Sequence, residues 1–133
     1  MTQGSTRGRI PAHGYTLLKD IANFIAGFER FQAKYFREER ELFTRLSRGQ
    51  QPRALVISCC DSRVDPAMLT GADPGDLFVM RNVANLVPPY RDDSEAPGVR
   101  SAIEFAVKTL QVEHIIVLGH SRCGGSKAQF NVV

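Results

Sequence analysis

The sequence predicts an α/β fold in which a parallel β-sheet forms the core and helices flank it. Three short apolar runs have the length and continuous hydrophobicity of strands buried on both faces, and they cover residues 54–58, 77–80 and 115–119. A helical pattern separates the second run from the third, and this order is typical of right-handed parallel crossovers. At 133 residues, the chain has room for one domain with a buried core.

A long helical region is predicted before the first strand. Residues 1–15 are rich in Gly, Ser, Thr and Arg and predict a flexible tail, whereas residues 16–133 are expected to form the α/β domain. From about Thr16 to Arg48, large apolar residues recur at helical spacing, and Gly27 is a candidate joint between two helices. We interpret this apolar stripe as core or subunit-contact packing rather than as a cofactor site.

Another helix is predicted between the second and third strands, from about Pro97 to Gln111. Proline suits a first helical position because its missing N–H would have no partner there. Apolar residues spaced three and four apart make the expected inner face, namely Val99, Ala102, Ile103, Ala106, Val107 and Leu110.

The bulk composition excludes several function classes. The net charge is +3, but the 17 basic residues are scattered among 14 acidic ones, so no nucleic-acid partner is expected. The apolar runs are too short to span a membrane, and no apolar segment typical of a signal peptide follows the N-terminal arginines. Three cysteines, two of them adjacent, fit no paired disulfide framework, and reduced thiols favour a cytoplasmic location.

The residues that carry chemistry are placed at strand ends. Cys59 follows the first predicted strand, His120 follows the third, and Cys123 is expected at the start of the next helix. Because the carboxyl ends of neighbouring parallel strands meet at one edge of a sheet, we expect these residues to converge. Thiolates and imidazole are preferred ligands of zinc, and His-x-x-Cys has a spacing typical of ligand pairs. Asp61 could be the fourth ligand of the metal, or it could leave the fourth position to a water molecule.

Three motifs in this chain resemble those of the β-class carbonic anhydrases. Residues 58–64, Ser-Cys-Cys-Asp-Ser-Arg-Val, match the C-x-D-S-R signature of that family. Residues 119–125 match its G-H-x-x-C-G-G motif, and residues 81–85 resemble its R-N-x-A-N segment. The resemblance extends from about Leu17 to Ala128, and all motifs stand in the family's order.

The resemblance implies a zinc lyase, a carbonate dehydratase. It implies that Cys59, His120 and Cys123 are the protein ligands of Zn²⁺, with Asp61 as a fourth ligand in a resting state. In the other state Asp61 would pair with Arg63 as a catalytic dyad. The implied reaction is the reversible hydration of carbon dioxide to bicarbonate and a proton by a zinc-bound hydroxide. The family also implies a homodimer or a higher homo-oligomer, and neither a nucleic-acid nor a membrane partner.

Several plainer interpretations stand beside this one. Free cysteines are usually small buried hydrophobic residues, and Cys60, at the variable motif position, is interpreted as inert packing. Asp61 and Arg63 could form a simple loop salt bridge. The same ligands would also serve a zinc hydrolase acting on carbonyl sulfide or carbon disulfide. Gly124 and Gly125 are interpreted as permitting close backbone approach rather than phosphate binding.

The chain ends ten residues after Cys123, earlier than members of the family that it resembles. We therefore expect the family's C-terminal strand and helices to be missing, so that the domain is incomplete. The third strand would then have an uncovered edge with apolar surface. A catalytically inactive, truncated zinc-binding paralogue is accordingly a further alternative.

Overall fold

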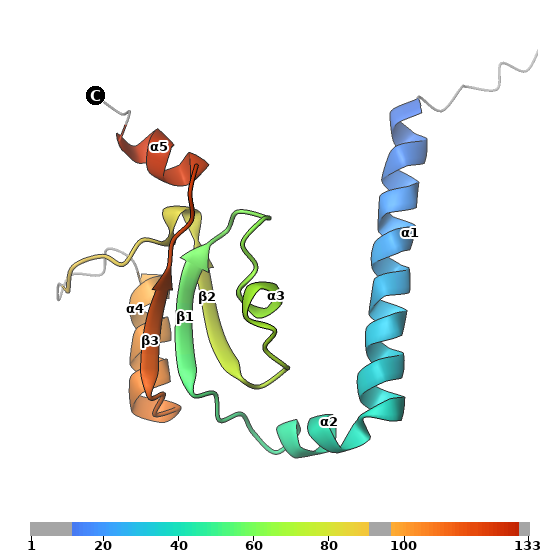
Figure 1. Ribbon diagram of the computed structural model, residues 1–133, viewed down its shortest axis with the longest axis horizontal. Coiled ribbons are helices and arrows are strands. Elements are labelled where there is room, and N and C mark those ends of the chain that lie inside the picture. Colours follow the sequence, from blue (N-terminus) through green and yellow to red (C-terminus); the bar gives the residue numbers. More distant parts are fainter. Residues whose placement is uncertain (1–11, 91–96, 131–133) are drawn as a thin grey trace, which may run out of the picture. The chain divides into compact units, whose positions relative to one another are not determined.

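The computed structural model describes residues 12–90 and 97–130 (Figure 1). The chain divides into two compact units, residues 1–48 and residues 49–133. The tail predicted for residues 1–15 lies mostly outside the described part, and its flexibility stays a prediction. Each unit is described by itself below.

The first unit is helical. Helix α1 covers Ala12–Ala33, a π-helical turn η1 covers Lys34–Glu38, and helix α2 covers Arg40–Leu46. The joint expected at Gly27 is wrong, because α1 continues through it. The break comes instead at Glu39, where φ is −108° and ψ is 45°, outside the helical range. Among the described residues, no helix is long and apolar enough to cross a membrane.

An aromatic cluster joins the helices of this first unit. The ring of Phe31 in α1 lies 4.9 Å from that of Tyr35 and 5.7 Å from that of Phe43, measured between ring centroids. The rings of Phe36 and Phe43 are 5.0 Å apart. These separations are within the range of favourable aromatic pairs, so the part of the predicted apolar stripe between residues 31 and 43 packs within this unit.

The second unit contains the predicted parallel sheet. Strand β1 covers Ala54–Cys59, β2 covers Leu77–Asn82 and β3 covers His114–Leu118. The strand order is β2-β1-β3, and both pairings are parallel. All three predicted strands are confirmed within one or two residues at their ends.

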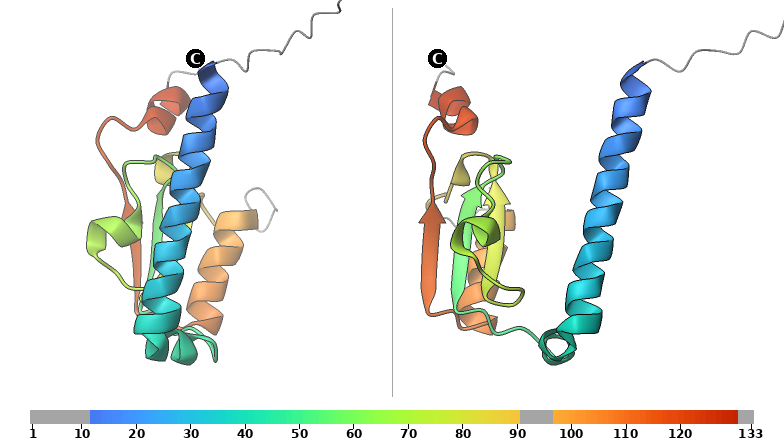
Figure 2. Two further views of the ribbon diagram at one scale, coloured as in Figure 1. Left: turned by 90° about the vertical axis from the view of Figure 1, so that its right-hand side faces the viewer. Right: turned by 45° about the vertical axis from the view of Figure 1, so that its right-hand side comes forward.

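Helices cover the sheet on both sides. Helix α4, Pro97–Glu104, continues as a π-helical turn η3, Phe105–Thr109, and confirms the helix predicted here. The short helix α3, Pro66–Thr70, lies on the opposite side of the sheet from α4 (Figure 2). The core beneath α4 and η3 contains Leu55, Ile57 and Ala106, with Phe78, Met80, Ile103 and Val112 packed against it.

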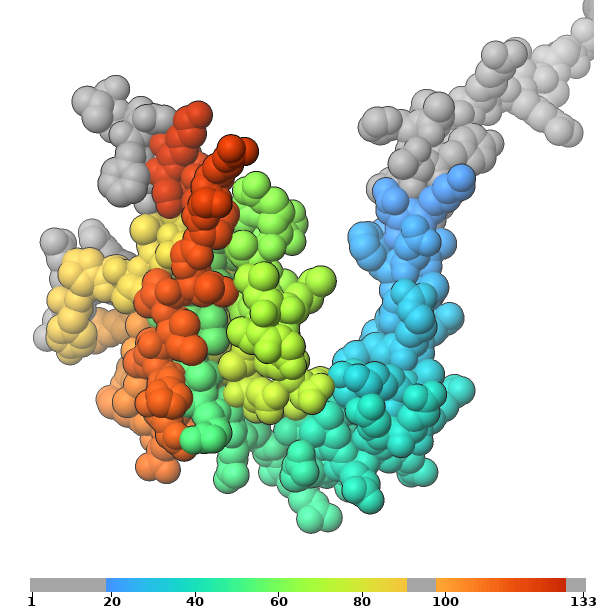
Figure 3. Space-filling view, viewed as in Figure 1, coloured from blue at the N-terminus to red at the C-terminus, as the bar shows by residue number. Residues whose placement is uncertain are grey.

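Burial differs between the strands. Every residue of β1 is buried, as expected for a central strand. The same expectation is wrong for β2, which is only half-buried and has Val79 41% exposed, and for β3, where the side chains of Ile115, Ile116 and Val117 are 50%, 46% and 53% exposed. The cause is that β3 is an edge strand in the described sheet, and its atoms lie at the surface in Figure 3.

Candidate metal centre

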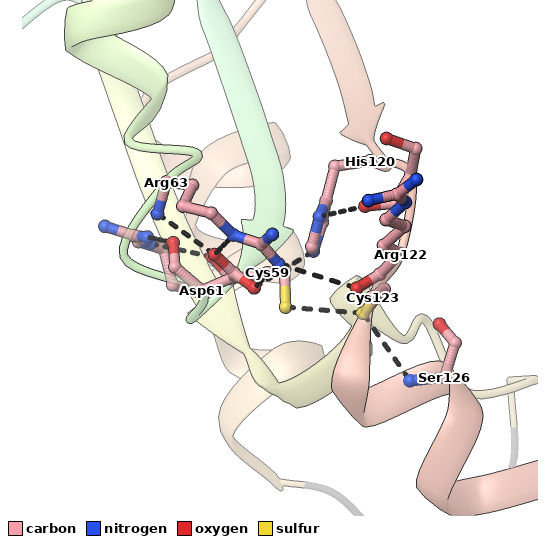
Figure 4. Close-up of polar contacts among 9 residues, drawn as sticks. Cys59, Asp61, Arg63, His120, Arg122, Cys123 and Ser126 are labelled. Carbon is pink, nitrogen blue, oxygen red and sulfur yellow. Dashed lines mark hydrogen bonds and ion pairs between the residues drawn. The ribbon is translucent and has the colours of Figure 1, made fainter.

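Three potential ligands meet at the carboxyl end of the sheet (Figure 4). Cys59 is the last residue of β1, and His120 follows β3 after Gly119. Cys123 immediately precedes helix α5, Gly124–Phe130. One ligand atom from each of these three residues lies within 4.8 Å of the other two. The structure therefore brings together the residues that the sequence places at neighbouring strand ends.

The two cysteine sulfurs are spaced as a shared metal ion requires. The Sγ atoms of Cys59 and Cys123 are 3.7 Å apart, and both residues are buried. A disulfide would bring them to about 2.05 Å. A tetrahedral zinc with bonds of about 2.3 Å to sulfur separates two such ligands by about 3.8 Å. The observed spacing fits joint coordination of one ion.

Hydrogen bonds to sulfur favour the thiolate at both cysteines. The pKa of Cys59 is lowered, chiefly because the backbone N–H of Asp61 donates to its sulfur, with a further backbone donor at Ala84. The pKa of Cys123 is lowered by the side chain and backbone N–H of Ser126, whose nitrogen lies 3.5 Å from Sγ. The thiolate is the form of cysteine that binds metals, so the backbone prepares both sulfurs for that role.

The ring of His120 is oriented to present one nitrogen to the sulfurs. Its Nδ1 lies 3.0 Å from the carbonyl oxygen of Ser121. Because a carbonyl can only accept, Nδ1 carries the proton in the neutral tautomer that this contact selects, and Nε2 is then the nitrogen with the lone pair. Among the described residues Nε2 is buried and has no hydrogen-bond partner. A buried, unpaired acceptor is costly unless something binds it, so Nε2 also fits a metal ligand.

A close backbone approach places Cys123 beside Cys59. A Cβ added at Gly125 would lie 2.5 Å from Cγ1 of Val83 and 2.9 Å from the backbone nitrogen of Ala84. The first turn of α5 can therefore contact the turn η2, Val83–Asn85, only with glycine at this position. The predicted close approach is borne out at Gly125. It is wrong for Gly124, where an added Cβ would meet nothing within 4 Å.

Asp61 is held by Arg63 at the border of the ligand cluster. Arg63 donates from Nε to Oδ1 at 2.8 Å and from Nη2 to Oδ2 at 2.7 Å, and its backbone N–H adds a third bond of 3.0 Å to Oδ1. These hydrogen bonds hold the pKa of the Asp61 carboxyl well below its usual range. Oδ2 of Asp61 lies 3.9 Å from Nε2 of His120. Of the two arrangements expected for Asp61, the structure contains the one paired with arginine.

The remaining cysteine lies outside the cluster. The side chain of Cys60 is exposed, so its interpretation as a packing residue is wrong, whereas its neighbour Cys59 is 4% exposed. Its backbone N–H donates to the carbonyl oxygen of Asn82 at 2.9 Å, at the end of the β1–β2 ladder. The alternation of a strand sends successive side chains to opposite sides, which explains why one cysteine points into the cluster and the next does not.

Sequence reasoning assigned no role to residues 81–85, although their motif was noticed. The side chain of Asn82 accepts from the backbone N–H of Leu86 at 2.7 Å and donates to its carbonyl at 2.8 Å, which closes the turn after β2. Within that turn Ala84 and Asn85 have φ values of 68° and 46°, a left-handed conformation uncommon outside glycine. The turn carries the Ala84 N–H that faces Cys59, so this segment shapes one wall of the cluster.

Comparison with known proteins gives one consistent family. The sequence model described as "Carbonic anhydrase" matches residues 54–132. A carbonic anhydrase of Synechocystis sp. is 48% identical over 107 residues, which are 80% of this chain and 38% of that protein. The solved structure of the β-carbonic anhydrase CcaA has a TM-score of 0.76 and 44% identity, over 83% of this chain and 48% of that one.

A second similar structure is that of a tetrameric β-carbonic anhydrase from Sordaria macrospora. Its TM-score is 0.64 and its identity 35%, over 91% of this chain and 56% of that one. The chain belongs to the carbonic anhydrase family, in its β class. It spans about two fifths of the length of the Synechocystis relative and about half of the solved chains, at 38%, 48% and 56% respectively.

Proposed function

We propose that this chain binds one zinc ion through Cys59, His120 and Cys123 and catalyses the reversible hydration of carbon dioxide. The observation that carries the proposal is the buried cluster of two thiols and one imidazole within 4.8 Å of one another. Family membership supports the reaction, because the similar proteins described above are named carbonic anhydrases. Those names favour carbon dioxide over carbonyl sulfide or carbon disulfide as the substrate.

The donor set supports zinc as the metal. Two thiolates and one imidazole match its preference for sulfur and nitrogen ligands. Three protein ligands in a tetrahedral arrangement leave one position open, which is the pattern of catalytic rather than structural zinc sites. When bound, zinc supplies a Lewis acid that makes water a competent nucleophile near neutral pH.

The residues around the cluster would orient the reacting water. Asp61 remains a carboxylate at neutral pH, because Arg63 holds its pKa far below the usual range. It can therefore accept a hydrogen bond from the water at Oδ2 but has no proton to donate. The planar guanidinium of Arg63 donates to both carboxylate oxygens, which keeps the Asp61 carboxylate in one orientation. The product proton would leave to a buffer or a shuttle group.

We also propose that the protein acts as a homodimer or a larger homo-oligomer in the cytoplasm. The tetrameric relative supports assembly, and so do large apolar side chains exposed on α1, which include Ile21, Phe24, Ile25 and Phe28. Light scattering coupled to size-exclusion chromatography measures the assembly directly. A monomer over a wide concentration range would contradict the proposed assembly.

The proposed reaction is tested by stopped-flow hydration of carbon dioxide together with elemental zinc analysis. We expect activity in the purified chain and its loss in Cys59→Ser and His120→Asn, because each change removes one ligand. Cys60→Ser is the matched control, since Cys60 is exposed and lies outside the cluster. One zinc per chain without hydration would contradict the reaction while leaving the metal site, and would select the inactive paralogue. Release of sulfide from carbonyl sulfide in place of hydration would select the hydrolase.

A further inference from the structure

One side chain outside the ligand cluster binds the loop that carries Cys59, Asp61 and Arg63. Arg81 belongs to β2, where it is the register partner of Ser58 in β1. Its Nε donates to the carbonyl oxygen of Cys59 at 3.0 Å, and its Nη2 donates to the carbonyl oxygen of Asp61 at 2.8 Å. A single guanidinium thus contacts the backbone of a candidate ligand and of the dyad carboxylate.

The contacts of Arg81 lie where the backbone pairing of β1 with β2 ends. The register of β1 with β2 ends at the pair Cys59 and Asn82, so the chain beyond Cys59 leaves the sheet. Backbone carbonyls outside a ladder need other donors when water has limited access. Arg81, whose side chain is 27% exposed, supplies such donors from the neighbouring strand. The loop is consequently fastened to β2 by side-chain bonds where the backbone ladder no longer holds it.

A third contact fixes the guanidinium itself. Nη1 of Arg81 donates to Oδ2 of Asp65 at 3.0 Å. The other oxygen of that carboxylate, Oδ1, accepts from the backbone N–H of Met68 at 3.1 Å and caps helix α3. Arg81 therefore spans the loop from Cys59 to Asp65, with the Asp61–Arg63 pair between its anchors. Arginine makes these three contacts from three separate nitrogens, Nε, Nη1 and Nη2, whereas the three donors of a lysine ammonium share one nitrogen and cannot reach all three acceptors.

We propose that Arg81 is a positioning residue of the metal centre. It fixes the backbone of residues 59–65 so that the sulfur of Cys59 faces Cys123 and the carboxylate of Asp61 meets Arg63 beside the cluster. Arg81 touches no ligand atom and acts only through the loop. This inference rests on the proposed metal-binding function and adds to it a residue on a different strand.

The test compares Arg81→Lys with Arg53→Lys by titration with cobalt(II), which takes the same kinds of ligand as zinc and absorbs visible light. Arg53 is a matched control because its guanidinium also forms two hydrogen bonds, of 3.3 and 2.7 Å, to the Glu113 carboxylate, and it is exposed. We expect Arg81→Lys to bind cobalt about 10- to 100-fold more weakly than wild type and to change the visible spectrum. Arg53→Lys is expected to have the cobalt affinity and the visible spectrum of wild type.

The outcomes separate this inference from the proposed function. A wild-type chain that binds no cobalt refutes the metal site, and the positioning role with it. If the wild-type chain binds cobalt and Arg81→Lys shows the same cobalt affinity and visible spectrum, the positioning role alone is overturned. If Arg81→Lys does not fold, Asp65→Asn takes its place, since it weakens the third anchor and retains an oxygen to cap α3. We then expect a several-fold loss of cobalt affinity, and an affinity equal to wild type overturns the inference.

Discussion

The sulfur atoms of Cys59 and Cys123 lie 3.7 Å apart, although the two residues are 64 positions apart in the sequence. The sheet topology creates this proximity, because β1 and β3 are parallel neighbours and both end at the same edge. Hydrogen bonds lower the pKa of both thiols: Asp61 and Ala84 donate from the backbone to Cys59, and Ser126 donates from its side chain and backbone to Cys123. The pair is thus prepared as thiolates at a distance that suits shared coordination rather than a disulfide.

Replacing either clustered cysteine should abolish stoichiometric zinc binding. Cys59→Ser and Cys123→Ser each remove a thiolate, the donor that gives the site its preference for zinc. We expect about one zinc per chain in wild type and much less in both variants, measured by elemental analysis after dialysis. Cys60→Ser should retain the wild-type content, because that side chain is exposed. Equal zinc in all four proteins would place the metal elsewhere.

The paired hydrogen bonds between Arg63 and Asp61 should affect the rate of carbon dioxide hydration more than the zinc content. Lysine in place of Arg63 keeps the charge but cannot reproduce the two parallel bonds of 2.8 and 2.7 Å. We expect Arg63→Lys to reduce the hydration rate about tenfold or more, in the range of lost orienting contacts, with zinc content unchanged. Stopped-flow rates normalised to bound zinc measure this. A rate equal to wild type would mean that the pair is only a surface salt bridge.

Adjacent glycines at the start of α5 should respond differently to alanine. Gly125→Ala places a methyl group 2.5 Å from Cγ1 of Val83 and 2.9 Å from the nitrogen of Ala84, so the two turns must separate. We expect a loss of about 1–3 kcal/mol in the free energy of unfolding, measured with urea. Gly124→Ala meets nothing within 4 Å and should be neutral or stabilise the helix by up to about 1 kcal/mol. Equal effects of the two substitutions would contradict the close approach.

The ion pair between Arg53 and Glu113 should contribute to stability only above acidic pH. Hydrogen bonds from Arg53 lower the pKa of the Glu113 carboxyl in the folded state. Its contribution is therefore complete above the unfolded-state pKa of about 4.3 and is lost as the pH falls through the lower, folded value. We expect Glu113→Gln to lower the urea midpoint slightly near neutral pH, where salt weakens the exposed pair. A difference from wild type that persists unchanged in acid would contradict the pairing.

Much of the fold and of the candidate site follows from local patterns. The run 54–58 is continuously apolar and lies in the centre of the sheet, where both faces are buried. The positions of Cys59 and His120 after their strands were enough to predict convergence, because the carboxyl ends of parallel strands share one edge. These inferences needed only strand order and direction.

Other features depend on contacts that a sequence does not reveal. The run 115–119 has the composition of a buried strand, so its local pattern does not predict the exposure of its side chains; only the uncovered edge expected from the family resemblance does. The motif at residues 81–85 marks Arg81 but does not reveal its contacts, because its acceptors include backbone carbonyls of another strand and loop. The break at Glu39 lies between segments whose aromatic rings contact one another, whereas the expectation at Gly27 rested only on the low helix propensity of glycine.

The central claim is that the sulfurs of Cys59 and Cys123 and one nitrogen of His120 bind the same metal ion. X-ray absorption at the zinc edge of the zinc-loaded chain tests this directly. Joint coordination by these three residues predicts two sulfur neighbours at about 2.3 Å and nitrogen or oxygen neighbours at about 2.0–2.1 Å. A spectrum with no sulfur shell, or with a single sulfur, would contradict it.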